Sequence, residues 1–306
     1  MKILITGATG FVGKQLTSKL LDEGHEIHVL SRDAQKAKGL FPQSQVKTFD
    51  WHNHLELPPV ECLSGIEGVI NLMGENIGAK RWSADQKRKL KESRINATQN
   101  LITLIENNLR VPLKFFISAS AVGIYPVNQK KMITETTEPA NSYLADLCRM
   151  WEETLSALTL SERKVIIRTA VVLEKGDGAL KKMLPPFKLG LGGPIGDGNQ
   201  MMSWIHLDDL VSLYLAAVKD DRYIGIFNAT APHPVCNFDF TKALGSALHR
   251  PTLFPVPALA LKIAFGEMSC IILDSQAVIS ERLKSVDFHF KYETIDRAFA
   301  AIFKRE

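Results

Sequence analysis

Short apolar runs alternate along the chain with longer stretches in which apolar residues recur at helical spacing. A short apolar run bounded by turn residues is typical of a strand buried on both faces of a parallel sheet. The alternation therefore predicts an α/β fold with a doubly wound parallel sheet. From residue 251 the pattern changes and helical spacing dominates, and we expect the C-terminal part to belong to a smaller α/β lobe. The apolar runs lie at residues 2–6, 26–30, 46–49, 68–72, 113–118, 164–170 and 223–229.

The first apolar run leads directly into a glycine-rich turn. Gly7, Gly10 and Gly13 recur every three residues, and helical spacing begins at Phe11. In a Rossmann-type fold the first glycine allows a tight turn, the second lets the backbone approach a pyrophosphate, and the third lets helix and strand pack closely. Free amides at the helix start then bind phosphate charge. We predict a dinucleotide site here; a purely structural strand-to-helix turn is the alternative.

Residues 6–13, TGATGFVG, resemble the opening of the extended short-chain dehydrogenase/reductases, the NAD-dependent epimerase/dehydratase family. Their GxxGxxG spacing differs from the GxGxxG spacing of many other dehydrogenases. The resemblance implies a Rossmann-type NAD(P)-binding domain. It also implies that the turn and three later segments supply coenzyme-binding residues, namely Gly7, Thr9, Gly10, Phe11, Val12, Gly13, Leu72, Met73, Gly74, Arg94 and Ser118.

The end of the second apolar run bears on which coenzyme is bound. The run is followed by Ser31, Arg32 and Asp33, at the position that faces the adenine ribose in such folds. An acidic residue there accepts from a ribose 2′-hydroxyl, whereas an arginine pairs with a 2′-phosphate. Ser31 and Arg32 are therefore predicted to bind the coenzyme, with NADP preferred and NAD possible. Asp33 follows one residue late, and an ordinary loop arginine is the alternative.

A serine and a tyrosine occupy positions where the family carries catalytic groups. Ser120 follows the fifth apolar run and best matches the family's serine or threonine that hydrogen-bonds the substrate oxygen. Ser118 is the second-best match for this residue. Tyr143 matches the family's tyrosine, but Leu147 stands where its lysine is expected. That lysine normally lowers the pKa of the tyrosine, which is ordinarily about 10. The resemblance therefore implies Ser120 and Tyr143 as catalytic residues, with weak activation of the phenol.

Three further segments and the tail narrow the resemblance to one branch of the family. Residues 118–123, 148–152 and 204–209 resemble a group labelled epimerase family protein, or sometimes cell-division inhibitor. This resemblance implies an NADP(H)-binding oxidoreductase or epimerase-like enzyme that acts on a nucleotide sugar or another small carbonyl or hydroxyl substrate. The loss of the lysine supports a second hypothesis, a catalytically weak NADP(H)-binding regulator or scaffold.

The pattern and the resemblance together suggest how the chain divides. Residues 1–175 are expected to form the NAD(P)-binding Rossmann domain, to which residues 200–230 return. Residues 176–199 and 231–306 are expected to form the substrate lobe, in which residues 251–306 are the family's C-terminal domain of unknown function. The segment 176–199 is rich in glycine and proline. Such a segment can act as a mobile lid over a substrate, or as a long connector.

Local signals predict where several helices begin. A capping box at Ser83 predicts a long helix that runs to about Leu109. Asp208 or Asp209 is predicted to cap the helix after residue 207, and Asn237 to cap another. These residue types favour helix starts because their side-chain oxygens accept from free backbone amides.

The C-terminal part carries apolar residues at helical spacing. Leu259, Leu261, Ile263 and Phe265 follow this pattern, which predicts that they belong to the core of the substrate lobe. The stretch from residue 253 to residue 273 is the most apolar in the chain, but it contains prolines, a lysine and a glutamate. It therefore reads as packed helices and not as a membrane span.

Composition and charge narrow the remaining options. The 306 residues are 45% hydrophobic and 23% charged, enough for one large domain and a smaller lobe. The net charge is +4 and is dispersed, which does not indicate nucleic-acid binding. Four separated cysteines favour a reducing, cytoplasmic location. Because the first predicted strand starts at residue 2, we expect no leader peptide. His52 and His54 lack a third ligand nearby, so no metal site is predicted. We also expect that the protein acts on a small-molecule substrate and that it is a monomer or a homodimer.

Overall fold

The computed structural model of the chain describes residues 1–52 and 55–304. The strands of the central sheet are β1 (Lys2–Thr6), β2 (Glu26–Ser31), β3 (Val46–Asp50), β4 (Gly68–Asn71), β5 (Phe115–Ala121), β6 (Lys164–Thr169) and β10 (Gly225–Ala229). They pair in parallel in the order β10-β6-β5-β4-β1-β2-β3. The predicted doubly wound sheet is confirmed. The strand order reverses between β1 and β4, where open sheets of this kind bind ligands at the carboxyl ends of the strands.

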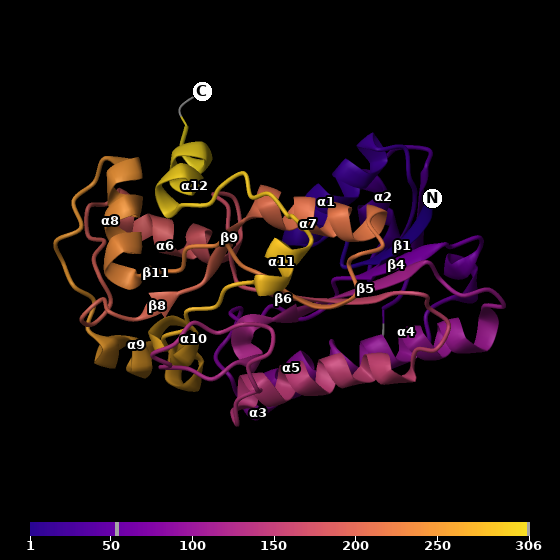
Figure 1. The fold of residues 1–306 in the computed structure, drawn as a ribbon, viewed down its shortest axis with the longest axis horizontal. Coiled ribbons are helices and arrows are strands. Elements are labelled where there is room, and N and C mark those ends of the chain that lie inside the picture. The colour runs from indigo at the N-terminus through magenta and orange to yellow at the C-terminus, as the bar shows by residue number, and fades with distance from the viewer. Residues whose placement is uncertain (53–54, 305–306) are drawn as a thin grey trace.

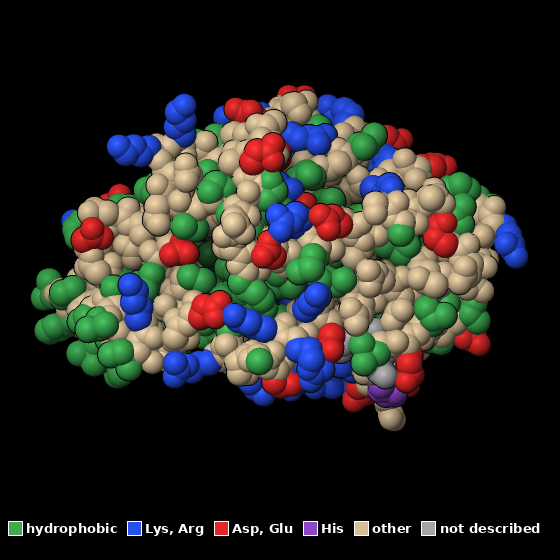
Figure 2. All heavy atoms as spheres, turned by 90° about the horizontal axis from the view of Figure 1, so that it is seen from below, with side chains coloured by type: hydrophobic (Ala, Val, Ile, Leu, Met, Phe, Trp, Pro, Cys, Tyr) green, Lys and Arg blue, Asp and Glu red, His purple; other side chains and the backbone are tan. Residues whose placement is uncertain are grey.

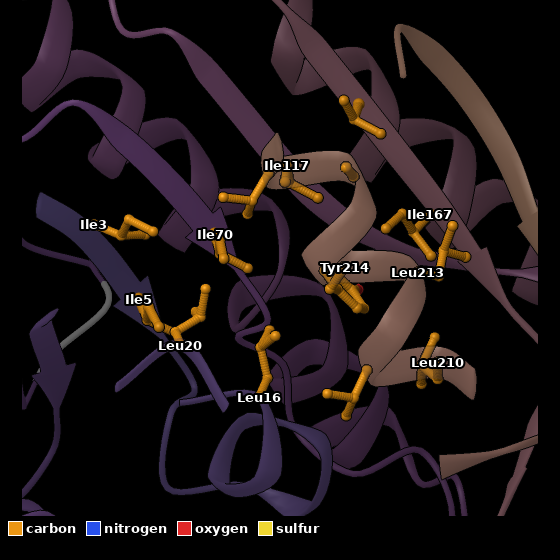
Figure 3. Packing of buried hydrophobic residues seen from close by; sticks show 14 of the residues in the cluster. Ile3, Ile5, Leu16, Leu20, Ile70, Ile117, Ile167, Leu210, Leu213 and Tyr214 are labelled. Atoms are coloured by element: carbon orange, nitrogen blue, oxygen red, sulfur yellow. The ribbon is translucent and has the colours of Figure 1, made fainter. Parts of the chain in front are cut away.

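Helices cover both faces of this sheet (Figure 1). One face carries α1 (Phe11–Asp22), α2 (Ala34–Leu40) and α7 (Leu207–Lys219), and the other carries α3 (Ala84–Glu92), α4 (Ile95–Asn108) and α5 (Tyr143–Glu153). The core under α1 and α7 is built from strand side chains that meet helix side chains. Figure 3 shows this packing, and its labelled residues are Ile3, Ile5, Leu16, Leu20, Ile70, Ile117, Ile167, Leu210, Leu213 and Tyr214. Each such burial contributes about 1.5 to 3 kcal/mol relative to exposure.

The remaining elements gather beside the sheet, at the left in Figure 1. They include β8 (Met201–Met202), β11 (Val235–Cys236), α6 (Gly178–Lys188), α8 (Asn237–Leu248), α9 (Ala258–Phe265), α10 (Cys270–Leu273) and α12 (Ile295–Ile302). Two short strands, β7 (Val171–Leu173) and β9 (Trp204–His206), pair in parallel and connect this part to the sheet, while α11 (Glu281–Ser285) packs near β10. A separate apolar cluster forms its core, including Leu180, Phe187, Trp204, Phe240 and Phe299.

The predicted single helix from Ser83 to about Leu109 is wrong, because the chain forms α3 and α4 with a break at Ser93 and Arg94. Ser83 does cap α3 by accepting from the amide of Gln86. At the break, the side chains of Ser93 and Arg94 donate to the Leu90 carbonyl at 3.2 and 3.1 Å. That carbonyl would otherwise accept the Arg94 amide, which bonds to Lys91 instead. Side-chain donors thus compete with the helix and interrupt it.

Two of the predicted helix caps are also wrong. His206 caps α7, since its Nδ1 accepts from the Asp208 amide at 3.0 Å, while Asp209 accepts from backbone amides of the C-terminal segment. Asn237 is the first residue of α8, and its Oδ1 accepts from the Ile195 amide at 2.7 Å. In both cases a tertiary partner uses the oxygen that the local pattern assigned to the helix end.

Segment 176–199 is less irregular than its glycine and proline content suggests. Its first half is α6, which Asp177 caps through the Gly178 amide. Leu180, Leu184 and Phe187 on α6 are buried in the cluster beside the sheet. The tertiary contacts of this apolar face outweigh the cost of two prolines inside the helix.

The prediction that the apolar residues of α9 belong to a core is wrong. Leu259 and Ile263 are 68% and 69% exposed, and no residue of α9 is buried. Leu253 and Phe254, just before α9, are 76% and 57% exposed. Figure 2 shows hydrophobic side chains gathered at this end of the molecule. Within residues 1–52 and 55–304, no helix has the length and apolar character needed to cross a bilayer.

Candidate functional site

The glycine turn has the geometry that a close backbone approach requires. Gly7 adopts a φ of +70°, which favours glycine, and its carbonyl accepts from the Gly10 amide at 2.9 Å. A Cβ at Gly13 would lie 2.1 Å from the Gly7 carbonyl oxygen, and a Cβ at Gly7 would lie 2.8 Å from the Leu72 carbonyl oxygen. Only hydrogen atoms fit at these points, so β1, β4 and α1 converge tightly.

The amino end of α1 is open for an anion. Gly10 is the N-cap of α1 and offers no side-chain acceptor, and the first turn, from Phe11, has no acidic residue. The first backbone amides of such a helix have no partner within it and carry a partial positive charge. The predicted binding residues Thr9 and Val12 lie in the same turn. This arrangement has the chemistry of a site for a linked pair of phosphates.

A buried hydrogen-bond network braces the sheet behind this turn. Thr6 at the end of β1 donates to Asn71 Oδ1 at 2.7 Å, and Asn71 Nδ2 donates to Thr98 Oγ1 at 2.9 Å. Trp151 of α5 also donates to Thr98, at 3.1 Å. The network joins two strands and two helices, so it fixes the carboxyl ends of β1 and β4. Sequence reasoning assigned no role to Thr6 or Thr98, because their hydrogen-bond partners lie on other elements of the fold.

The residues predicted to face the adenine ribose lie at the end of β2. Asp33 caps α2, since its carboxylate accepts from the Lys36 amide at 2.7 Å, and the Ser31 hydroxyl donates to the Asp33 carbonyl at 3.1 Å. Arg32 is exposed and has no hydrogen bond or ion pair with the described residues. The acidic neighbour is thus engaged by a helix, whereas the arginine is free to meet an incoming phosphate.

Ser120 does not stand alone at the end of β5. Its hydroxyl donates to Glu152 Oε1 at 2.5 Å, and Arg168 holds both oxygens of Glu152 at 2.8 and 2.7 Å. Arg168 also donates to the hydroxyl of Tyr125, which donates in turn to Asn228, at 2.7 and 2.8 Å. Burial lowers the pKa of Arg168, but the contacts with Glu152 outweigh it and the pKa is raised. Ser118 lies nearby, and its hydroxyl donates to the Ala119 carbonyl.

Glu152 and Arg168 were missed at the sequence level. Glu152 stands in the segment 148–152 that carried the family resemblance, but no acid was expected to contact Ser120. The pairing register offers the missing signal, because Ser120 on β5 lies opposite Arg168 on β6. A carboxylate within reach of both side chains is then required to neutralise a buried arginine.

Tyr143 is the first residue of α5, and the structure does not bring it into contact with Ser120. Its hydroxyl lies 3.5 Å from the Lys87 carbonyl, and its ring is 5.2 Å from that of Trp82. Burial raises the pKa of this phenol. Leu147, one turn further along α5, is only 3% exposed and packs in the same apolar cluster.

A different stripe of α5 faces the end of β5. Leu144, Cys148 and Glu152 recur every four residues, and residues four apart share one face of a helix. Leu144 lies against Gly123, and Glu152 binds Ser120. Burial raises the pKa of the Cys148 thiol to about 11. The groups nearest Ser120 on this helix are therefore a neutral thiol and a carboxylate. The pairing of Ser120 with Tyr143 stays a prediction.

Gly74 and Arg94 lie together after β4. The Arg94 guanidinium lies 3.0 Å from the position that a Cβ on Gly74 would take, and it donates to the Glu75 carbonyl at 2.9 Å. Burial lowers the pKa of Arg94. Met73 and Leu72, predicted with them, form the same segment at the carboxyl end of the strand next to β1.

Two further features bear on the site. Among the described residues no group of three or more His, Cys, Asp and Glu side chains could hold a metal ion. His52 is exposed, and His54 lies outside the described residues. A hollow of about 400 Å³ lies in the part beside the sheet, lined by residues that include Gln200, Lys262 and Ser275 but neither Ser120 nor Tyr143.

Comparisons with known proteins agree with this geometry. Residues 3–229 match the model of the NAD dependent epimerase/dehydratase family, and residues 256–302 match a domain of unknown function, DUF1731. The Arabidopsis thaliana protein named epimerase family protein SDR39U1 homolog, chloroplastic, is 38% identical over 99% of this chain and 86% of its own.

Two solved structures are also similar. The human epimerase family protein SDR39U1 (isoform 2), crystallised with NADPH, has a TM-score of 0.86 and 30% identity, and all of both chains is covered. A nucleoside-diphosphate sugar epimerase from Corynebacterium glutamicum has a TM-score of 0.76 and 30% identity over 99% of this chain and 58% of its own. The turn, the sheet and these matches together establish that the chain belongs to the NAD-dependent epimerase/dehydratase family.

Proposed function

We propose that the protein binds NADP(H) at the β1–α1 turn and carries out oxidoreduction of a small carbonyl or hydroxyl substrate. The uncapped amino end of α1, beside glycines with no room for a side chain, is the observation that carries the proposal. The free guanidinium of Arg32 supports NADP over NAD, and the human relative solved with NADPH agrees. When bound, the coenzyme accepts or supplies hydride at its nicotinamide ring.

The site residues follow the sequence prediction. The pyrophosphate would be held by Gly7, Gly10 and the first residues of α1. The adenosine end of the coenzyme would be bound by Ser31 and Arg32. Ser120 would hydrogen-bond the reacting oxygen, and Tyr143 would relay a proton. A nucleotide sugar is the favoured substrate class, since the Corynebacterium relative is named for one. Under this proposal residues 1–175 and 200–230 form the coenzyme domain, and residues 176–199 and 231–306 the substrate lobe.

The proposal is tested with purified protein, NADPH and NADH. Calorimetry should show NADPH binding more tightly than NADH, and absence of heat with either coenzyme would refute the site. Turnover is then followed at about 340 nm with a panel of nucleotide sugars, aldehydes and quinones. Loss of turnover in Ser120→Ala and in Tyr143→Phe, with NADPH binding retained, supports the catalytic assignment. Full turnover in Tyr143→Phe would show that Tyr143 is not a catalytic residue.

One observation favours a second function, an NADP(H)-binding regulator or scaffold. Leu147 occupies the lysine position and is buried among apolar side chains, and Tyr143 has a raised pKa. Tight coenzyme binding without turnover of any panel member would support this function. A cytoplasmic location and a monomeric or homodimeric state stay predictions.

A further inference from the structure

The position where the family carries its lysine cannot supply a charge to Tyr143. Leu147 is 3% exposed and packs with Leu90, Ile95 and Trp151. A cation placed there would lose its hydration inside an apolar cluster. If Tyr143 relays a proton, as proposed above, its phenolate needs a positive charge from another element.

Arg94 carries such a charge into the same region from the break between α3 and α4. Its side chain donates to the carbonyls of Leu90 and Glu75, and its guanidinium carbon lies 5.3 Å from the centre of the Trp151 ring. Among the described residues, the contacts of the Arg94 guanidinium are these two carbonyls and the Trp151 ring, and none of them is an ion pair with a carboxylate. The guanidinium is therefore enclosed by carbonyl groups and an aromatic face, and the Glu75 carboxylate acts on it through space without forming an ion pair.

The carboxyl-terminal part of α3 sets the distance between this charge and the phenol. The Tyr143 hydroxyl lies against the Lys87 carbonyl, and Arg94 Nη1 lies against the Leu90 carbonyl. Carbonyls three residues apart in a helix are separated by about 4.5 Å along its axis. The phenol and the guanidinium thus bind to the same turn of one helix. Their mutual attraction acts against the burial that raises the pKa of Tyr143.

The other charged and titratable groups near Tyr143 do not take this role. The Lys87 ammonium lies 4.6 Å from the centre of the Tyr143 ring, but Glu267 neutralises it at 2.8 and 2.7 Å. Cys148, on the next stripe of α5, is a thiol whose pKa burial raises to about 11, so it is neutral at physiological pH. Among the described residues Arg94 is a cation that faces the phenol without a carboxylate in ion-pair contact, and its charge lowers the pKa of Tyr143 whereas that of Glu267 raises it.

We propose that Arg94 is a positioning residue that supplies Tyr143 with the positive charge that the family obtains from lysine. The inference rests on the proposed role of Tyr143 in proton relay. It also explains why the helix is interrupted at Ser93 and Arg94: the break turns the guanidinium towards the end of β4. If α3 and α4 formed one continuous helix, the side chain of residue 94 would point outward from that helix and not towards the end of β4.

The test measures the ionisation of Tyr143 directly and needs no substrate. Protein labelled with ¹³C at the tyrosine ζ position is titrated by NMR, and the Tyr143 signal is assigned by its loss in Tyr143→Phe. In Arg94→Met the midpoint should move upward by about one pH unit, because a charge one helical turn away is removed. Arg94→Lys should retain most of the wild-type value. Arg88→Met, the same change at an exposed arginine of α3 paired with Asp85 and Glu92, should leave the midpoint unchanged.

An unchanged midpoint in Arg94→Met would overturn the proposal. Arg94→Gln, which keeps a donor for the Glu75 carbonyl, provides a second neutral variant should the methionine variant fail to fold, and the same upward shift is expected there. Circular dichroism confirms folding of each variant. Because the readout is a titration of the phenol, it is separate from coenzyme binding and turnover. A shift without turnover would retain the inference about Arg94 and refute the proposed oxidoreductase function.

Discussion

The Glu152 carboxylate accepts three strong hydrogen bonds in a nearly closed space. One comes from Ser120 and two from Arg168, and the two charged side chains are only 11% and 6% exposed. Removing one member of a buried ion pair leaves the other charge without compensation, which typically costs about 3 to 5 kcal/mol. The pair therefore holds the end of β5 and the Ser120 hydroxyl in one geometry.

Changing Glu152→Gln should lower the free energy of unfolding by about 3 kcal/mol, because Arg168 stays buried without its counter-charge. The matched control is Glu153→Gln, an exposed neighbour on the same helix, which should change it by less than about 0.5 kcal/mol. Urea unfolding followed by circular dichroism measures both. Equal losses in the two variants would contradict the role assigned to the buried pair.

Arg32 is the residue on which coenzyme choice is expected to depend. Replacing Arg32→Asp should weaken NADPH binding about tenfold to a hundredfold, since a charge-assisted phosphate contact is lost and a repulsion is added. NADH binding should change far less, as it has no 2′-phosphate. Arg110→Asp makes the same charge change at an exposed residue that precedes β5, whereas Arg32 follows the carboxyl end of β2, and it serves as the control. Calorimetry that finds NADPH affinity equal in Arg32→Asp and wild type would exclude a phosphate contact.

At the scale of elements, two helix glycines differ in the space around them. A Cβ at Gly13 of α1 would meet the Gly7 carbonyl oxygen, whereas a Cβ at Gly39 of α2 would meet nothing within 4 Å. Gly13→Ala should push α1 away from β1 and reduce NADPH binding more than tenfold, because the phosphate-binding amides move with the helix. Gly39→Ala should instead stabilise the fold by about 0.5 to 1 kcal/mol. Calorimetry and thermal unfolding of both variants check this contrast, and unimpaired NADPH binding by Gly13→Ala would refute it.

Elements with strong local signals could be predicted from the sequence, and those set by distant partners could not. The apolar runs gave the parallel strands, since a strand buried on both faces has few polar residues. The break at Arg94 depends on the carbonyls of Leu90 and Glu75, and the second of these lies on another segment. Likewise, nothing local indicates that Asp209 would bind residues 291 and 292 and leave the helix cap to His206.

The same distinction holds for the candidate site. The glycine turn and Arg32 were recognisable because their chemistry is carried by consecutive residues. Glu152 and Arg168 lie on different elements, and only the sheet register brings them to Ser120. Counting from Ser120 selected Tyr143, but a one-residue difference in helical phase turns that side chain towards α3.

For the molecule as a whole, the C-terminal residues are fixed to the rest of the chain by several buried contacts. Ile133 pairs with Val278, and the Asn228 amide donates to the Ile279 carbonyl at 3.0 Å. Asp209, 1% exposed, accepts from the backbone amides of Lys291 and Tyr292 at 2.7 and 3.0 Å. These contacts predict that the two matched sequence regions unfold together in one transition.

The Asp209 contact predicts a pH dependence with a defined sign. Burial raises the pKa of Asp209, so the folded carboxyl binds its proton at a pH where the unfolded one has lost it. Its contribution to stability is full below the unfolded pKa, about 3.9, and is lost as the pH rises through the folded pKa. The stability advantage of wild type over Asp209→Asn should therefore be smaller at about pH 7 than at about pH 4.

Urea unfolding of wild type and Asp209→Asn at both pH values measures this difference. Asp208→Asn, which changes a half-exposed neighbour, is the control and should show no comparable trend. A stability advantage that grows between the acidic and the neutral measurement would contradict the assignment, because it would mean that the folded protein prefers the ionised carboxylate.

The dense attachment of the C-terminal residues, combined with the exposed stretch around Leu253, has a practical consequence. If the gene is split at this stretch, it encodes two fragments whose contact surfaces are complementary. Co-expressed, they should reassemble without a covalent link, which would turn this fold into a complementation reporter whose signal depends on the recovery of coenzyme binding.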